Sequence, residues 1–327
     1  MVPVNGQARL TWDQSADLDV RVGGHVQIRH SPDLSGVDWA DTVTISAEVA
    51  GAATEVYCDL KEGTYLAKFV DASGVESLSA ALSEFVEPDL DNIETISTLT
   101  EHPSFAGTKS NLTVNTGLNE LELSSAGSGT YETSGTYTLG AITLSDIFSV
   151  SLKSTLKVRS YFPSAATIDT FADFDAISDF DGLKPSGNNV QLQIRTSQVS
   201  SGSNWSSWHP FNNAQFKARR WQARALVTST DNTSQMAISQ LQIKANLPWR
   251  TVSNSVTTSA SADVAVTYAN KFYATPAIGV QFTTQSTGDY YVISNSAATG
   301  FSISVYDSSN ARVARAVTWT ATGYGKN

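Results

Sequence analysis

The chain has a single cysteine, Cys58, so no disulfide can form within it. This argues against a small secreted scaffold that is held together by disulfides. No run of about 18 apolar residues is present, so we expect no membrane insertion. The first seven residues lack a basic stretch followed by an apolar core, and we therefore expect no Sec signal peptide.

Charge is scarce and unevenly distributed. Charged residues make up 16% of the 327 residues, below the average of roughly 25% for globular domains. Residues 1–89 contain five Lys/Arg and fifteen Asp/Glu, whereas the rest of the chain has 16 of each. An acidic segment repels nucleic acid and suits docking on a basic partner surface. A solvated acidic domain without a partner explains the same charge, and both interpretations remain open.

Signatures of catalysis and of long fibres are also missing. The chain has no Gly-x-Ser-x-Gly motif, and its four histidines do not have the spacing of metal ligands. Cys58 lies in an apolar pattern that predicts packing rather than nucleophilic chemistry. We therefore expect no enzymatic activity and no cofactor. No Gly-X-Y period and no heptads occur, which argues against a long fibrous shaft.

What the chain has in abundance is alternation of apolar and polar residues, the pattern of strands with one buried face. With 41% hydrophobic residues over 327 positions, two to three packed domains are expected. The predicted fold class is all-β, built from tandem β-sandwiches. We place the domains at residues 1–89, 93–248 and 249–327, separated by the acidic segment 87–92 and by 247–250.

The first domain carries alternating strands at residues 8–12, 25–30 and 63–71. An early Trp12, a later Tyr65 and the Gly-x-x-Ser turn at 74–77 resemble a fibronectin type III module. The resemblance covers nearly all of the segment. It implies a spacer or adaptor and says nothing about chemistry.

The second domain contains about ten short strands bounded by turns and no convincing amphipathic helix. This pattern predicts a jelly-roll-like sandwich. Within it, the loop at 205–211 and the strand at 219–227 resemble the C-terminal region of host-specificity (tail-tip) proteins of tailed phages. There the aromatic loop corresponds to a packing corner.

The same two segments offer a secondary candidate site for a ligand. Indole rings can stack on a pyranose ring, and planar guanidinium donors suit carboxylates, phosphates or sugar hydroxyls. A packing corner and a ligand contact both remain open for these side chains. The candidates are Trp205, Trp208, Arg220 and Arg224.

Residues 169–182 place five carboxylates in a short window. Such a density of hard oxygen ligands suits Ca²⁺, although no Glu closes the loop as in an EF-hand. A solvated acidic loop, anchored by the interleaved Phe residues, is the alternative. The same carboxylates are the candidates for a glycosidase pair. The residues concerned are Asp173, Asp175, Asp179 and Asp181.

The last eighty residues carry the clearest pattern, because apolar and polar residues alternate strictly through 278–282 and 301–305. This segment resembles the H-type lectin fold, a six-stranded sandwich of trimeric sugar-binding proteins, and the terminal domain of phage tail fibres. The matching framework positions are Phe272, Pro276, Gly300, Phe301, Trp319 and Ala321. In that fold the sugar lies at the rim between neighbouring subunits of a parallel trimer.

The positions of the loops in this segment suggest the ligand-binding residues. Carboxylate, amide and guanidinium groups can bond to sugar hydroxyls, and an aromatic ring can stack on the sugar. Ordinary solvated loops remain the alternative. The candidates are Asp289, Tyr290, Tyr291, Asp307, Asn310 and Arg312.

The order of the three domains resembles the distal part of a phage tail-tip or tail-fibre protein. It implies a homotrimer in the virion that docks on a tail hub or baseplate protein and binds a host surface glycan or protein receptor. A trimer would raise weak affinity by roughly 10²–10⁴. A tail-borne glycan depolymerase and a purely structural baseplate component are the alternatives.

Overall fold

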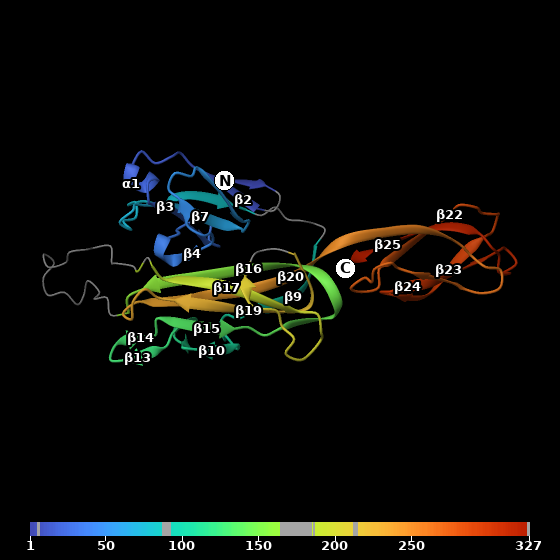
Figure 1. The fold of residues 1–327 in the computed structure, drawn as a ribbon. Coiled ribbons are helices and arrows are strands. Elements are labelled where there is room, and N and C mark those ends of the chain that lie inside the picture. The colour runs from blue at the N-terminus through green and yellow to red at the C-terminus, as the bar shows by residue number, and fades with distance from the viewer. Residues whose placement is uncertain (5–6, 87–92, 164–184, 186, 212–214, 326–327) are drawn as a thin grey trace, which may run out of the picture.

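The computed structural model describes residues 1–4, 7–86, 93–163, 185, 187–211 and 215–325. Strands make up 58% of the residues and helices 2%, which confirms the predicted all-β class. The helices are the short α1 (Leu18–Arg21) and the 3₁₀ helix η1 (Trp39–Asp41). No helix in the described ranges is long and apolar enough to cross a membrane. Figure 1 shows an N-terminal sandwich against one side of a middle domain, from whose end a tip domain projects.

The N-terminal domain is a sandwich of two sheets that enclose one apolar core. In β2 the residues Ala8 and Leu10 are buried and their neighbours are exposed, as the alternation predicted. One sheet contains β1 (Val2–Val4), β2 (Gln7–Thr11) and β6 (Glu55–Asp59). The other contains β3 (His25–Ser31), β4 (Val43–Thr44), β5 (Val49–Ala50), β7 (Gly63–Val70) and β8 (Ala81–Phe85).

Tyr65 fixes the corner between β6 and β7. Its ring is buried, its hydroxyl donates to the carbonyl of Asp59 at 2.8 Å, and the same oxygen accepts the amide of Lys61 at 2.6 Å. A tyrosine that bonds back to the backbone at this corner is typical of immunoglobulin-like sandwiches. The neighbouring Cys58 is buried, and burial raises the pKa of its thiol to about 12, so it packs as a neutral side chain.

The middle domain is dominated by long antiparallel strands around a single core that includes Tyr137, Phe148 and Trp221. The strand β16 pairs with β19 through its first half and with β20 through its second half. The shorter strands are β9 (Ile93–Thr100), β10 (Thr108–Ser110), β11 (Leu112–Asn115), β12 (Glu120–Leu123), β13 (Ser125–Gly127), β14 (Thr130–Tyr131) and β15 (Ser134–Thr138). The others are β16 (Ile142–Tyr161), β17 (Asn189–Ser197), β18 (His209–Pro210), β19 (Gln215–Thr228) and β20 (Gln235–Thr257).

The tip domain has two sheets that face each other across a second apolar core containing Phe272, Phe301 and Trp319. The end of β20 pairs with β25 (Ala316–Tyr324), which pairs with β22 (Ala277–Phe282). The facing sheet has the order β21 (Val264–Thr267), β24 (Gly300–Tyr306) and β23 (Tyr290–Ala297).

No loop separates the middle domain from the tip. The segment Leu247–Arg250, predicted as a boundary, lies inside the 23-residue strand β20. The core changes along this strand, because Leu247 packs in the middle domain and Val252 packs in the tip. The tip is therefore joined to the middle domain by continuous sheet.

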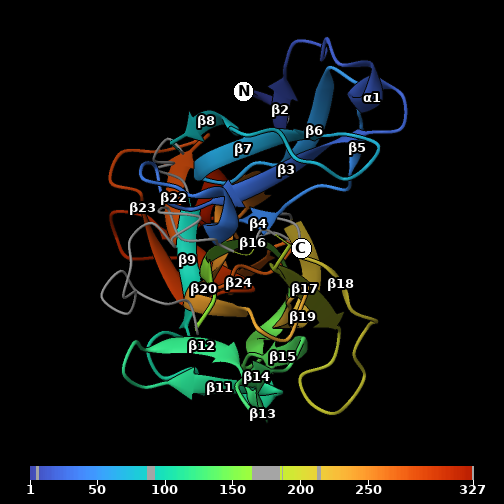
Figure 2. The same ribbon diagram turned by 90° about the vertical axis from the view of Figure 1, so that its left-hand side faces the viewer.

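The N-terminal domain lies against the middle domain (Figure 2). Specific polar contacts join the two domains. Arg29 is 1% exposed and donates to the carbonyls of Thr42 and Asn188 at 2.8 and 2.7 Å. Asp41 accepts the amide of Ser160 at 2.8 Å. Burial lowers the pKa of Arg29 to about 10, so its guanidinium group stays charged within this interface at neutral pH.

Candidate functional site

The loops that the sequence singled out meet at the end of the tip farthest from the middle domain. In the pairing of β20 with β25, Trp249 lies opposite Tyr324 and Thr257 lies opposite Ala316. The residues that immediately follow Thr257 and those that immediately precede Ala316 are therefore at the free end. The loop 283–289 reaches the same end, since Phe282 pairs with Val317.

At this end, the outer surface of the sheet β21–β24–β23 presents polar and aromatic side chains. Tyr290 lies opposite Tyr306 in register, and their rings stack with centroids 5.5 Å apart and planes 17° apart. The Tyr290 side chain is 42% exposed. We call the following set the distal face: Asp263, Tyr290, Ser304, Tyr306, Asn310 and Arg312.

A network of hydrogen bonds holds the distal face in one arrangement. Arg312 donates to Ser304 Oγ at 2.7 Å and forms an ion pair with Asp263, which also accepts from Ser304 at 2.5 Å. The Arg312 guanidinium lies 5.2 Å from the ring centroid of Tyr306. Tyr290 donates its hydroxyl hydrogen to Asn310 Oδ1 at 2.8 Å.

The electrostatics keep the Asp263–Arg312 pair charged. Hydrogen bonds from Ser304 and then from Arg312 hold the pKa of Asp263 below its ordinary value. The bond to Asp263 raises the pKa of Arg312 above its ordinary value. Both groups are therefore ionised at neutral pH, in fixed positions beside an aromatic pair in which Tyr290 is exposed and Tyr306 is half-buried. Such a surface offers donors, acceptors and a ring face to a polar ligand.

Three of the predicted residues have other positions. Asp289 has a fully buried side chain that accepts from Arg315 Nε at 2.6 Å and from the amide of Ser286 at 2.7 Å, so it braces the loops. Hydrogen bonding to Arg315 and Ser286 lowers its pKa. Asp307 caps its own turn by accepting the amides of Ser309 and Ala311.

Tyr291 points away from the distal face. Strand alternation places it on the side opposite Tyr290, where its ring lies 6.0 Å from that of Phe282. Of the six predicted residues, the structure thus brings Tyr290, Asn310 and Arg312 together.

Sequence reasoning missed Tyr306, Ser304 and Asp263. The first two follow from the alternation of β24, because Phe301, Ile303 and Val305 face the core and the residues between them face outward. Asp263 carries no comparable signal, since it reaches Ser304 across 41 positions.

The secondary candidates lie on the outer surface of β17 and β19, where guanidinium groups and indole rings alternate in a stack. We call this stack the ladder. The guanidinium carbon of Arg220 lies 4.3 Å from the Trp205 centroid, and that of Arg224 lies 4.5 Å from the Trp208 centroid. Arg195, which sequence reasoning missed, lies 4.8 Å from Trp205 and 4.5 Å from Trp208. Each indole therefore contacts two guanidinium groups.

The register explains the alternating order of this ladder. Arg195 lies opposite Gln222, midway between Arg220 and Arg224 along β19. A two-residue step of a strand is about 6.6 Å, which leaves room for one ring between successive guanidinium groups. Both indole rings are therefore engaged within the protein, and we assign the ladder to packing of the loop on the sheet.

We expect Arg195→Ala to lower the free energy of unfolding by about 1–2 kcal/mol, because it removes two cation–π contacts. Arg195→Lys should restore only part of this, since a lysine lacks the planar group that stacks between the rings. Urea unfolding followed by tryptophan fluorescence measures the effect. Lys217→Ala, at an exposed position of β19, is the control. Equal stability of Arg195→Ala and the control would contradict the assignment.

The acidic candidates Asp173, Asp175, Asp179 and Asp181 lie outside the described residues. Within the described ranges, no group of three or more His, Cys, Asp or Glu side chains is placed to hold a metal ion.

The chain is only weakly similar to known proteins. No family model matches the chain, and no curated protein matches it. Recombinant discoidin II of Dictyostelium discoideum superposes with a TM-score of 0.20 at 10% identity, covering 59% of this chain and 78% of that one. Carbohydrate-binding modules of the β-sandwich superfamily give 0.19 at 12% identity, covering 68% and 98%. A structure of infectious bursal disease virus, Gx strain, gives 0.20 at 8% identity, covering 98% and 64%. TM-scores at this level carry no argument about function.

Proposed function

We propose that this chain is an adhesion protein that binds a glycan through the distal face of its tip domain. The observation that carries the proposal is the stacked pair Tyr290–Tyr306 beside the fixed Asp263–Arg312 ion pair. Sugar recognition needs an aromatic surface for the ring and charged or amide groups for the hydroxyls. The stacked tyrosines and the ion pair lie at the free end of the projecting tip domain, where a partner on another surface can reach them (Figure 1).

We further propose that the protein belongs to a phage tail tip or tail fibre, with its acidic N-terminal domain on a hub or baseplate protein. The charge of that domain supports this placement. In this proposal the protein holds its receptor and breaks no bond.

A homotrimer is part of the same proposal. The strand β23 lies at the edge of the sheet β21–β24–β23 in the tip. On this strand Tyr291 is 40% exposed and Val292 is 43% exposed. Exposed edges of this kind are commonly covered in an assembly. Three copies would also raise the avidity of a weak site by roughly 10²–10⁴.

Two measurements on the purified chain test the proposal. Binding to immobilised bacterial surface polysaccharides, including lipopolysaccharide and capsule preparations, should be saturable, and light scattering should give the mass of three chains. Absence of binding to every preparation would overturn the glycan proposal. A monomeric mass would overturn the trimer and leave the distal face to be tested as a single site.

A further inference from the structure

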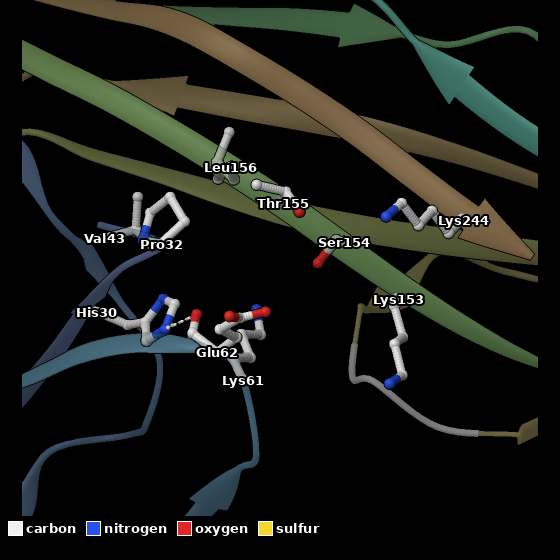
Figure 3. A pocket seen from close by; sticks show the side chains of 10 residues that line it. All are labelled: His30, Pro32, Val43, Lys61, Glu62, Lys153, Ser154, Thr155, Leu156 and Lys244. Atoms are coloured by element: carbon white, nitrogen blue, oxygen red, sulfur yellow. Dashed lines mark hydrogen bonds between the residues drawn. The ribbon is translucent and has the colours of Figure 1, made fainter. Parts of the chain in front are cut away.

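A cleft lies between the N-terminal and middle domains, on the opposite part of the molecule from the distal face. It consists of two adjoining cavities of about 110 and 360 Å³ that share Val43, Lys61 and Leu156 in their walls. Figure 3 shows the smaller cavity, with His30, Lys61 and Glu62 on one side and residues of β16 and β20 on the other. Small-molecule sites commonly form at such interfaces between domains.

The smaller cavity gathers positive charge. Lys153 of β16 and Lys244 of β20 lie directly opposite each other in register, and both line the cavity together with Lys61. Glu62 is the acidic residue in the wall, and His30 adds no charge because burial lowers its pKa to about 3.

Lys61 is the central group of the cleft, since it lines both cavities. Tyr65 holds its backbone at the β6–β7 corner through the 2.6 Å hydrogen bond described above. Its ammonium group makes no hydrogen bond or ion pair with any residue in the described part of the chain. Burial lowers the pKa of this group, against the opposing effect of the Asp59 carboxylate. Lys61 lines both cavities, so an anion in the cleft would pair with its ammonium group.

The larger cavity has the mixed lining of a sugar site. Thr44, Asn189 and Gln191 contribute polar groups, and Ile45 and Phe211 contribute apolar surface. The hydroxyl of Ser46, in the same wall, is buried and has no hydrogen-bond partner. A volume of about 360 Å³ falls within the range of roughly 300–1,000 Å³ that small-molecule sites occupy.

We propose that this cleft binds a monosaccharide that carries an acidic group. The carboxylate or phosphate lies in the smaller cavity between Lys61 and Lys244, and the sugar ring occupies the larger cavity beside Ser46 and Phe211. The occupant contacts both domains, so its binding also strengthens their docking. The site is separate from the distal face and does not depend on the proposed glycan receptor.

Isothermal titration of the full chain tests the proposal with glucuronic acid, glucose 6-phosphate, inorganic phosphate and neutral glucose. We expect one or both sugar acids to bind at least tenfold more tightly than glucose and than phosphate alone. The sugar acid that binds identifies the acidic group. Lys61→Gln should weaken that binding at least tenfold, and Lys217→Gln, which removes the same charge elsewhere, should leave it unchanged.

Lys244→Gln serves as a second variant, because Lys244 is exposed on its strand and its loss leaves the core intact. It should also weaken binding, and the thermal stability of each variant without ligand shows that it is folded. Failure of both sugar acids to bind, or full binding by both lysine variants, would overturn the proposal. Arg312→Ala should bind the sugar acid normally, which distinguishes a failure of this site from a failure of the distal face.

Discussion

Arg312→Ala should weaken glycan binding by about 10- to 100-fold while the tip stays folded. The guanidinium group bonds to Ser304, pairs with Asp263 and lies over Tyr306. Its loss therefore removes the group that holds these three side chains in one arrangement. A charged donor held in a fixed position typically contributes roughly 10- to 100-fold to the affinity for a polar ligand, which sets the expected range. The pair is partly exposed, so the effect on stability should be small. Titration against the polysaccharide that the native chain binds gives the measurement.

Lys271→Ala is the matched control, since it removes one positive charge from the same domain at a distance from the distal face. Lys271 pairs with Asp146 of the middle domain at 3.4 Å, and its loss should leave glycan affinity unchanged. Equal glycan binding by Arg312→Ala and Lys271→Ala would show that the receptor site does not lie on the distal face.

Trp319→Ala should strongly destabilise the tip and leave the stability of the middle domain almost unchanged. Trp319 is 4% exposed, and its ring lies 5.7 Å from Tyr268 and 5.6 Å from Phe301 in the tip core. Truncation of a buried tryptophan costs about 3–5 kcal/mol, a large part of the total stability of about 5–15 kcal/mol that a domain has. Calorimetry should show a tip transition at a much lower temperature and an almost unchanged transition of the middle domain.

Trp249→Ala provides the comparison, because Trp249 is 42% exposed and packs on Tyr324 at the junction. We expect a loss of about 0.5–1.5 kcal/mol, the range of an aromatic pair. If Trp319→Ala lowered both transitions together, the tip and middle cores would form one cooperative unit rather than two.

Strict alternation carried most of the predictive information in the sequence. It gave the all-β class and the buried faces of β19 and β24, because the period of two directly decides which side chain faces a core. Tyr290, Asn310 and Arg312, which the structure brings together, were predicted as candidates for a related reason. Asn310 and Arg312 belong to the polar turn after β24, and Tyr290 follows a polar turn at the start of β23. Such turns gather at the ends of a sandwich.

The partners of these residues could not be predicted, because they depend on which strands pair. Asp263 joins Arg312 only because β21 lies beside β24. Arg195 enters the ladder because the register places it opposite Gln222. The cleft at Lys61 requires the docking of two domains, which no local pattern encodes. The continuity of β20 was not predicted either, because the sequence interpretation placed a domain boundary at Leu247–Arg250.

The unbroken course of β20 has a mechanical consequence. Its flanking hydrogen bonds, to β9 and β16 on the middle side and to β25 on the tip side, run across the strand direction. A pull on a tethered tip along the strand therefore loads these bonds together in shear, instead of opening them one after another. Because β20 crosses the junction without a flexible linker, a torque applied at the end of the tip is transmitted directly to the middle domain.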